Sequence, residues 1–324
     1  MIRKDSGGRM GGSMKGIYFD GTRALYREDI PIPRPRAEES LVKVLMAAVC
    51  NTDKEILKGY RPDFHGVMGH EFVGVVEQSP DSALIGKRVV GELNASCGHC
   101  IYCRTGRTTH CSSRRVLGMH QKDGCFSEYM TIDTSLLHVV PDKLSADKAI
   151  YTEPLAAAFE ILTQVETGPE KNIAVLGDGR LSYCVVQAMR AVGERATVIG
   201  KHPEKLELFR PFAHVSTEWE REGYEIVVEA TGSPGGILQA LEMVRKKGII
   251  VLKSTYAGET SLPLSLVAVN EISIIGSRCG PFAPALEALG DGRARFPDIT
   301  LFSLEQFQEA FSFTGFKAGF LISS

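Results

Sequence analysis

Three residue types that bind zinc in proteins occur between Val49 and Glu71. The stretch begins Val49-Cys50-Asn51-Thr52-Asp53 and ends Gly69-His70-Glu71. A catalytic zinc needs only three protein ligands of the thiolate, imidazole and carboxylate types, because its fourth position is kept for water or substrate. Cys50 and His70 with one carboxylate would therefore form a complete open site. The alternative is that the cysteine is a small buried hydrophobe and the histidine an ordinary core or surface residue.

A second group of ligands follows within 15 positions, at Cys97, Cys100, Cys103 and Cys111. Two residues between successive cysteines let neighbouring sulfurs converge on one ion, and four thiolates fill a tetrahedral shell. Such a shell has no open position, so this spacing predicts a structural zinc. Thiolate sets overlap between metals, so an iron–sulfur cluster stays open, as does a redox pair or disulfides.

Composition limits the class of protein. The 324 residues exceed one typical core and suggest two domains, and a net charge of -2 predicts neither nucleic acid nor membrane as a partner. Residues 1–13 are rich in glycine and lack the apolar stretch of a signal peptide, so we expect a disordered lead-in. We therefore expect a cytoplasmic protein whose eight cysteines are reduced.

Two patterns of elements must position these ligands. Up to about residue 140, short glycine-punctuated apolar runs predict a compact β-barrel-like domain, with a hairpin and three further strands at 14–26, 41–46, 72–77 and 87–91. From about residue 145, helical spacing over 147–165 is followed by alternating strands and helices, which predict a doubly wound α/β sheet. Its expected strands are 172–176, 196–199, 225–229, 248–252 and 271–275, with helices 183–192 and 236–244.

The first strand of this sheet is followed by a glycine loop, Gly177-Asp178-Gly179-Arg180-Leu181-Ser182. Strand, glycine turn and helix are the context in which a dinucleotide pyrophosphate binds at a helix N-terminus, although Ser182 stands where a third glycine is usual. The alternative is a strand–helix turn without a ligand. The second strand ends in Gly200-Lys201-His202, where users of NAD carry an acid. A cation suits the 2′-phosphate of NADP, so these residues favour NADP, with NAD still open.

The motifs together resemble one family. Gly69-His70-Glu71, the four cysteines, Gly177-x-Gly179 and Glu229-Ala230-Thr231-Gly232 occur in the order and at the spacing of the zinc-dependent medium-chain alcohol and polyol dehydrogenases. The resemblance extends from about residue 14 to the end. It implies a GroES-like β-barrel-type catalytic domain plus a Rossmann domain with a doubly wound parallel sheet, the catalytic domain at 14–150 and 285–324 and the Rossmann domain at 151–284.

The resemblance also implies roles for individual residues. The catalytic zinc would be held by Cys50, His70 and Glu153, since Glu153-Pro154-Leu155 looks like the polyol and threonine dehydrogenase branch. Glu71 would be a neighbouring carboxylate or an exchanging ligand, Asp53 would orient the histidine, and Thr52 would relay a proton. The cofactor would be bound by Gly177, Gly179, Arg180, Leu181, Gly200, Lys201, His202, Thr231, Ser254 and Arg278.

The implied function is a zinc-dependent, NAD(P)-dependent oxidoreductase that moves a hydride between an alcohol or polyol and the cofactor, with two zincs per chain, as a homodimer or homotetramer. One alternative is a non-catalytic NADP-binding, zinc-stabilised protein of the same fold, and another is a zinc-free reductase. Polar and aromatic side chains near the expected pocket are compatible with a polyol, sugar or amino alcohol, namely Tyr60, Phe64, His65, Tyr102 and Arg278.

Overall fold

The computed structural model describes residues 12–255 and 259–323, and their contacts divide the chain into two compact units. The first unit runs to Glu153 and resumes at Phe296, and the second is Pro154–Arg295. Of the expected lead-in, residues 1–11 lie outside the described residues, and Ser13 begins the first strand. Within the described ranges, no helix combines the length and the apolar character needed to cross a membrane.

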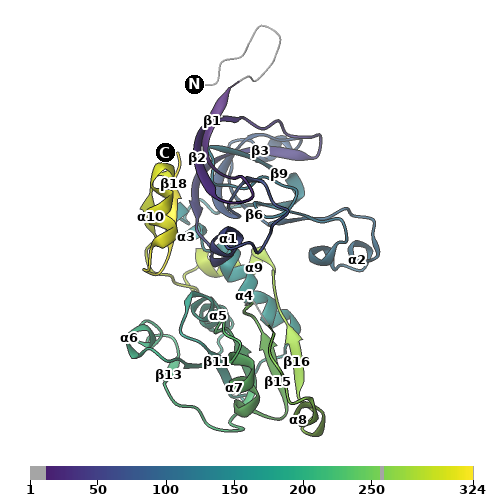
Figure 1. Ribbon diagram of the computed structural model, residues 1–324, viewed down its shortest axis with the longest axis vertical. Coiled ribbons are helices and arrows are strands. Elements are labelled where there is room, and N and C mark those ends of the chain that lie inside the picture. The colour runs from purple at the N-terminus through teal and green to yellow at the C-terminus, as the bar shows by residue number, and fades with distance from the viewer. Residues whose placement is uncertain (1–11, 256–258, 324) are drawn as a thin grey trace. The chain divides into compact units, whose positions relative to one another are not determined.

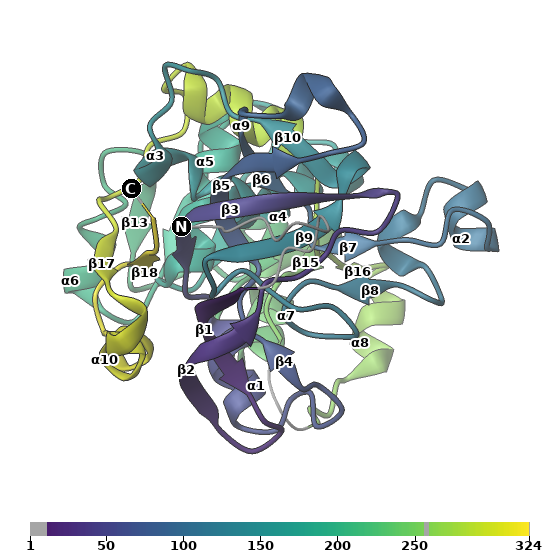
Figure 2. The ribbon, with the colours of Figure 1, turned by 90° about the horizontal axis from the view of Figure 1, so that it is seen from above.

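The first unit is built mainly from antiparallel strands, as the glycine-punctuated pattern predicts. β1 (Ser13–Phe19) and β2 (Ala24–Pro31) form the expected hairpin. β3 (Glu39–Ala48) is the central strand of the larger sheet: β5 (Glu71–Gln78) pairs along one edge, and β9 (Tyr129–Asp133) pairs with its first half. Figure 2 shows β5, β6 and β9 around β3. The sheet order is β10-β6-β5-β3-β18-β17, and β2-β1-β4 and β7-β8 form two smaller sheets.

Short elements complete this unit. Its remaining strands are β4 (Gly66–Val67), β6 (Arg88–Gly91), β7 (Asn94–Ala95), β8 (Arg115–Val116), β10 (Leu137–Val139) and β17 (Thr300–Phe302). Its helices are α1 (Asn51–Leu57), α2 (Ile101–Arg104), α3 (Ala146–Ala149) and α10 (Phe307–Ser312), and α4 (Thr152–Gln164) begins at its boundary. The expected helix over 147–165 is thus two helices, and Pro154 is tolerated because it lies in the first turn of α4.

The end of the chain returns to this unit, as predicted. β18 (Ala318–Leu321) pairs antiparallel with the last residues of β3, so that Gly319 faces Ala48 and Leu321 faces Met46. In Figure 1, β18 and α10 lie together at the side of this unit. The larger sheet is therefore completed by a strand near residue 320, about 270 positions after the end of β3.

The chain around His70 is held by close backbone contacts among three glycines. Gly69 has φ +93°, and a Cβ on Gly118 or Gly124 would approach the carbonyl oxygen of Gly69 to 2.2 or 2.1 Å. The same segments are joined by backbone hydrogen bonds, in which Cys125 donates to Gly69 at 3.0 Å. Since backbone atoms cannot move aside as a side chain can, glycine at 118 and 124 fixes the path that leads into His70.

The second unit contains a six-stranded parallel sheet in the order β13-β12-β11-β14-β15-β16. The order reverses at β11 (Ile173–Leu176), whose neighbours are β12 (Thr197–Ile199) and β14 (Tyr224–Glu229), so β11 is the switch point of a doubly wound fold. The other elements are α5 (Arg180–Ala191), α6 (Pro203–Leu206), β13 (His214–Ser216), α7 (Gly236–Met243), β15 (Val244–Leu252), α8 (Leu264–Val269), β16 (Ser273–Gly276) and α9 (Phe282–Gly290).

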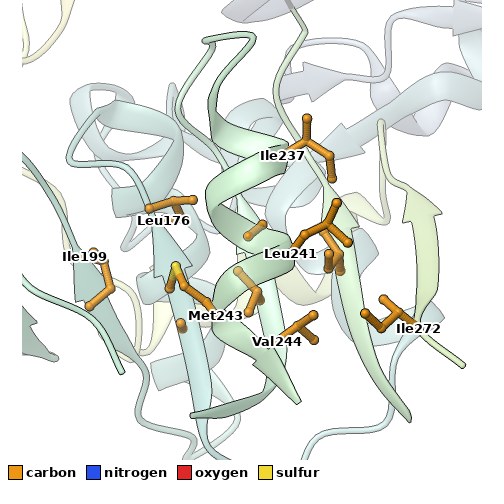
Figure 3. Close-up of a cluster of buried hydrophobic side chains, with 11 residues drawn as sticks. Leu176, Ile199, Ile237, Leu241, Met243, Val244 and Ile272 are labelled. Carbon is orange, nitrogen blue, oxygen red and sulfur yellow. The ribbon is translucent and has the colours of Figure 1, made fainter. Parts of the chain in front are cut away.

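The core on one face of this sheet explains why the apolar runs become buried strands. Figure 3 shows Ile237 and Leu241 of α7 gathered with strand residues such as Leu176 and Ile199. All are 5% exposed or less, so α7 and the strands beneath it form one buried core.

Residues 285–295, which we expected in the first domain, belong to the second unit. The reason lies in contacts with α5: the Arg293 guanidinium donates to the carbonyl of Ala191 at 2.9 Å, and the Arg295 amide donates to Gln187 Oε1 at 2.9 Å. α9 also buries Phe282 and Leu286. The apolar pattern of α9 does not reveal which core it joins.

We expect Gly124→Ala to lower the free energy of unfolding by about 1–3 kcal/mol, the range for overpacking. The added Cβ would lie 2.1 Å from the oxygen of Gly69 and 2.4 Å from that of Met68. Urea unfolding followed by circular dichroism measures the loss. Gly276→Ala is the control, because a Cβ there meets nothing within 4 Å. Equal stability of the two variants would contradict the steric role of Gly124.

Candidate metal and cofactor sites

The first candidate site begins at the N-terminus of α1, where Cys50 is the N-cap residue. Asp53, the third residue of the helix, reaches back and accepts the Cys50 amide hydrogen at 2.8 Å through Oδ2. This is a capping box, in which a carboxylate at the third helical position satisfies the amide before the helix. Asp53 is 0% exposed. The sequence Cys-Asn-Thr-Asp therefore fixes the cysteine by local hydrogen bonding.

The same carboxylate meets His70 from a distant part of the chain. Asp53 Oδ1 lies 3.4 Å from His70 Nδ1, an ion-pair distance that lacks good hydrogen-bond geometry. Burial alone would lower the pKa of His70, but Asp53 and, to a smaller extent, Cys50 raise it well above its usual value. A histidine that binds a metal must be neutral, so metal binding at His70 is coupled to the loss of a proton.

Cys50, His70 and Glu71 form one group, since a ligand atom from each lies within 4.8 Å of the others. Glu71 begins β5 and is 1% exposed. Its Oε2 lies 2.5 Å from Lys317 Nζ, just before β18, yet neither carboxylate oxygen has hydrogen-bond geometry with any described residue. A buried carboxylate is costly unless it is paired, and the Lys317 ammonium neutralises this one. Together with a thiol and an imidazole, it makes a donor set that fits zinc.

The other residues expected here are placed differently. Thr52 lies in the first turn of α1, with its Oγ1 3.7 Å from Cys50 Sγ, so thiol and hydroxyl face each other. Glu153 lies in the first turn of α4, partly buried, and is not a member of the three-residue group. Lys317 was not recognised from the sequence, and no local signal could have shown it, because it approaches Glu71 only when β18 pairs with β3.

The four cysteines form a second group of ligands, with their sulfurs within 4.8 Å of one another. Cys100 Sγ lies 3.5 Å from Cys103 Sγ, and the Cys97 amide donates to Cys111 Sγ at 3.3 Å. Backbone amides of Cys103 and Ser112 lower the pKa of Cys100 to about 6. Four convergent sulfurs with amide donors fit a tetrahedral ion that binds thiolates.

The predicted cofactor residues gather at the carboxyl edge of the parallel sheet. Gly177 follows β11 with φ +122°, and a Cβ there would meet the Ala230 oxygen at 2.8 Å. Gly179 is the N-cap of α5, and a Cβ on Gly179 would meet nothing within 4 Å. Arg180 and Leu181 lie in the first turn of α5. The open space at Gly179 and the backbone amides at the helix N-terminus fit a pyrophosphate.

The next loops along this edge are tied together by Glu229, the last residue of β14. Its Oε1 accepts the Thr231 amide at 2.8 Å, and its Oε2 accepts the Ser254 hydroxyl at 2.6 Å. Lys253 is 8% exposed and donates to the Arg278 carbonyl, so the loops after β15 and β16 are also joined. Thr231, Ser254 and Arg278 thus share one edge. Glu229 and Lys253 were not predicted as site residues; a charged residue at the end of a buried strand was the available signal.

The loop after β12 differs from its sequence-based interpretation. The amides of Lys201 and His202 both donate to the Asp178 carboxylate, which comes from the glycine loop after β11. Asp178 was not among the predicted cofactor residues. The preference for NADP stays a prediction, and this carboxylate bears on it.

The side chains expected near a substrate pocket have varied surroundings. Phe64 is 2% exposed and stacks on Phe19, so it is part of the core. His65 Nδ1 lies 3.0 Å from the Asp20 carbonyl. Tyr60 and Tyr102 are exposed, at 56% and 37%, and each lies under an arginine. The arrangement of these rings does not single out a substrate.

Comparisons with known proteins agree on one family. Residues 36–142 match the alcohol dehydrogenase GroES-like domain. The chain is 26% identical over 326 residues to sorbitol dehydrogenase of Bacillus subtilis, covering 92% of each chain. A zinc-binding dehydrogenase of Sinorhizobium meliloti bound to NADP superposes with a TM-score of 0.88 at 23% identity, covering 96% of this chain and 99% of that one. An Escherichia coli alcohol dehydrogenase with NADH bound superposes with a TM-score of 0.85 at 24% identity, covering 96% of this chain and 100% of that one.

Proposed function

Because this chain belongs to the zinc-dependent medium-chain alcohol and polyol dehydrogenases, we propose that it oxidises an alcohol or polyol, or reduces the matching carbonyl, with a nicotinamide cofactor. The first unit carries the metal ligands and the second the cofactor loops. The expected fold, a GroES-like domain with a Rossmann domain, is confirmed.

The observation that carries the proposal is the buried group of Cys50, His70 and Glu71 within 4.8 Å. Two of these donors, Cys50 and His70, both face Asp53, which is 0% exposed, so a thiol and an imidazole are held together beside a buried carboxylate. A non-catalytic relative of this fold would retain the four-cysteine loop for stability, but gains nothing from this group.

The chemistry divides between bound groups and the chain. When bound, zinc supplies a Lewis acid that polarises an alcohol or carbonyl oxygen, and the nicotinamide cofactor accepts or donates the hydride. Asp53 orients both Cys50 and His70 through its two oxygens. Thr52 lies beside Cys50, and its hydroxyl can both accept and donate a proton, so it fits a relay that carries the alcohol proton outward.

Two further parts of the proposal concern the assembly and its location. A homodimer or homotetramer is supported by the apolar surface of α8, where Leu264 is 69% and Val269 80% exposed beside the edge strand β16 (Figures 1 and 2). A cytoplasmic location is supported by the eight cysteines, since none of them lies in a disulfide bond in the described part of the chain.

The proposed activity is tested by turnover of polyols, sugars and amino alcohols with NAD and with NADP, alongside zinc per chain. We expect two zincs, one of which leaves under mild chelation together with activity. One tightly held zinc without turnover would instead identify a cofactor-binding protein. Turnover without zinc would identify a zinc-free reductase.

A matched pair of variants decides which carboxylate is the third ligand of the catalytic zinc. We expect Glu153→Ala to lose that zinc and the activity while the zinc of the four-cysteine loop stays. Glu71 is near the thiol and imidazole, but Lys317 already neutralises it at 2.5 Å, and this cation competes with a metal. Glu71→Gln, which keeps the shape of the side chain, should therefore retain both zincs by elemental analysis. If Glu71→Gln loses the catalytic zinc while Glu153→Ala retains both zincs, the third ligand is Glu71.

We expect Cys103→Ser to release the other zinc and to lower the melting temperature and the yield of folded protein. The reason is that a four-thiolate metal site contributes its binding free energy to folding. Protein that remains folded should keep near-normal turnover per active site, because this metal has no open position. A stable, fully folded variant lacking all four cysteines would contradict a structural role for the zinc of the four-cysteine loop.

A further inference from the structure

Asp178 lies in the glycine loop after β11, but its carboxylate is bound by the loop after β12. Its Oδ2 accepts the Lys201 amide at 2.8 Å and the His202 amide at 2.9 Å, and lies 2.9 Å from His202 Nδ1. Its Oδ1 lies 3.9 Å from Lys205 Nζ. The side chain is 11% exposed. One carboxylate thus occupies both successive amides of this turn.

The turn that Asp178 contacts follows β12, the strand whose end is expected to lie near the adenosine ribose of the cofactor. In a doubly wound dinucleotide-binding sheet, the end of the second strand meets the adenosine ribose, and an acid there binds the 2′-hydroxyl. Two successive backbone amides form an anion site. In this chain that site would suit the 2′-phosphate of NADP, but the carboxylate of Asp178 already fills it.

The glycine at position 200, which would leave room for a 2′-phosphate, is also explained by the contact with Asp178. A Cβ on Gly200 would lie 2.7 Å from Asp178 Cβ and 2.9 Å from Leu206 Cδ2. The glycine is therefore required by the close approach of Asp178, whether or not a phosphate enters. For this reason Gly200→Asp, the usual exchange at the end of this strand, would disturb the packing and could not report on the cofactor.

We propose that Asp178 is a specificity-determining residue for the cofactor: it replaces, from the neighbouring loop, the acid that the second strand lacks. The inference rests on the proposed function. Oδ2 withholds the two amides from a 2′-phosphate, and the negative charge repels it. Oδ1, with Lys205 as its nearest cation at 3.9 Å, accepts a hydrogen bond from the ribose 2′-hydroxyl. Lys201, with an exposed side chain, acts in the opposite direction and attracts the phosphate.

The charge state of Asp178 agrees with this role. Burial raises the pKa of Asp178, but hydrogen bonds from His202 and Lys201 outweigh it, so the pKa lies below its usual value. The carboxylate is therefore ionised at neutral pH, where the cofactor binds.

The test is the ratio of NADPH to NADH affinity, measured by calorimetric titration of the zinc-loaded protein. Asp178→Asn keeps the size of the side chain and removes its charge. We expect the ratio to rise about tenfold or more, since a hydrogen bond to a charged group is worth at least about one factor of ten. Asp178→Ser serves as a second variant in case the first is poorly folded.

Glu204→Gln is the matched control, because it removes the same charge from an exposed residue in the first turn of α6. In Glu204→Gln the ratio of NADPH to NADH affinity should change by less than about twofold. An unchanged ratio in folded Asp178→Asn, or an equal rise in Glu204→Gln, would overturn the assignment. Binding of neither cofactor by the unmodified protein would instead overturn the proposed function.

Discussion

The buried carboxylate of Asp53 is the interaction on which the candidate metal site depends. It caps α1 through the Cys50 amide and faces His70, so one side chain fixes two candidate ligands that lie 20 positions apart. A buried charge is stable only when it is paired, and here its partners are an amide and an imidazole of the site. The placement of the two candidate ligands and the folding of this region therefore depend on the same contacts.

Local patterns predicted those parts of the chain whose structure depends on neighbours in sequence. The hairpin of β1 and β2, the strands of the parallel sheet and the four-cysteine loop follow from alternation, apolar runs and short spacing. The family implied by the motifs is also the family found by comparison. Residues 285–295 were expected in the first domain but lie in the second compact unit, because an amphipathic helix shows that it is buried, but not against which core.

What the sequence could not reveal are contacts between segments far apart. Lys317 meets Glu71 through strand pairing at the chain end, and Asp178 meets Lys201 and His202 because β11 and β12 are adjacent in the sheet. In both cases a charged side chain from a distant segment changes the electrostatic surroundings of a motif whose role was inferred from local sequence. Gly200-Lys201-His202 suggests an open cationic site, whereas the structure gives it an acidic neighbour.

The pairing of β18 with β3 has a consequence for biosynthesis. The ribosome makes Ala48 about 270 residues before Ala318, yet the first unit needs both strands for its central sheet. At about 5–20 residues per second, the interval is on the order of 10–60 s. During that time the edge of β3 that awaits β18 is exposed on the nascent chain, while the second unit, being continuous in sequence, can fold as soon as it emerges. The first unit to be translated is thus the last to be completed.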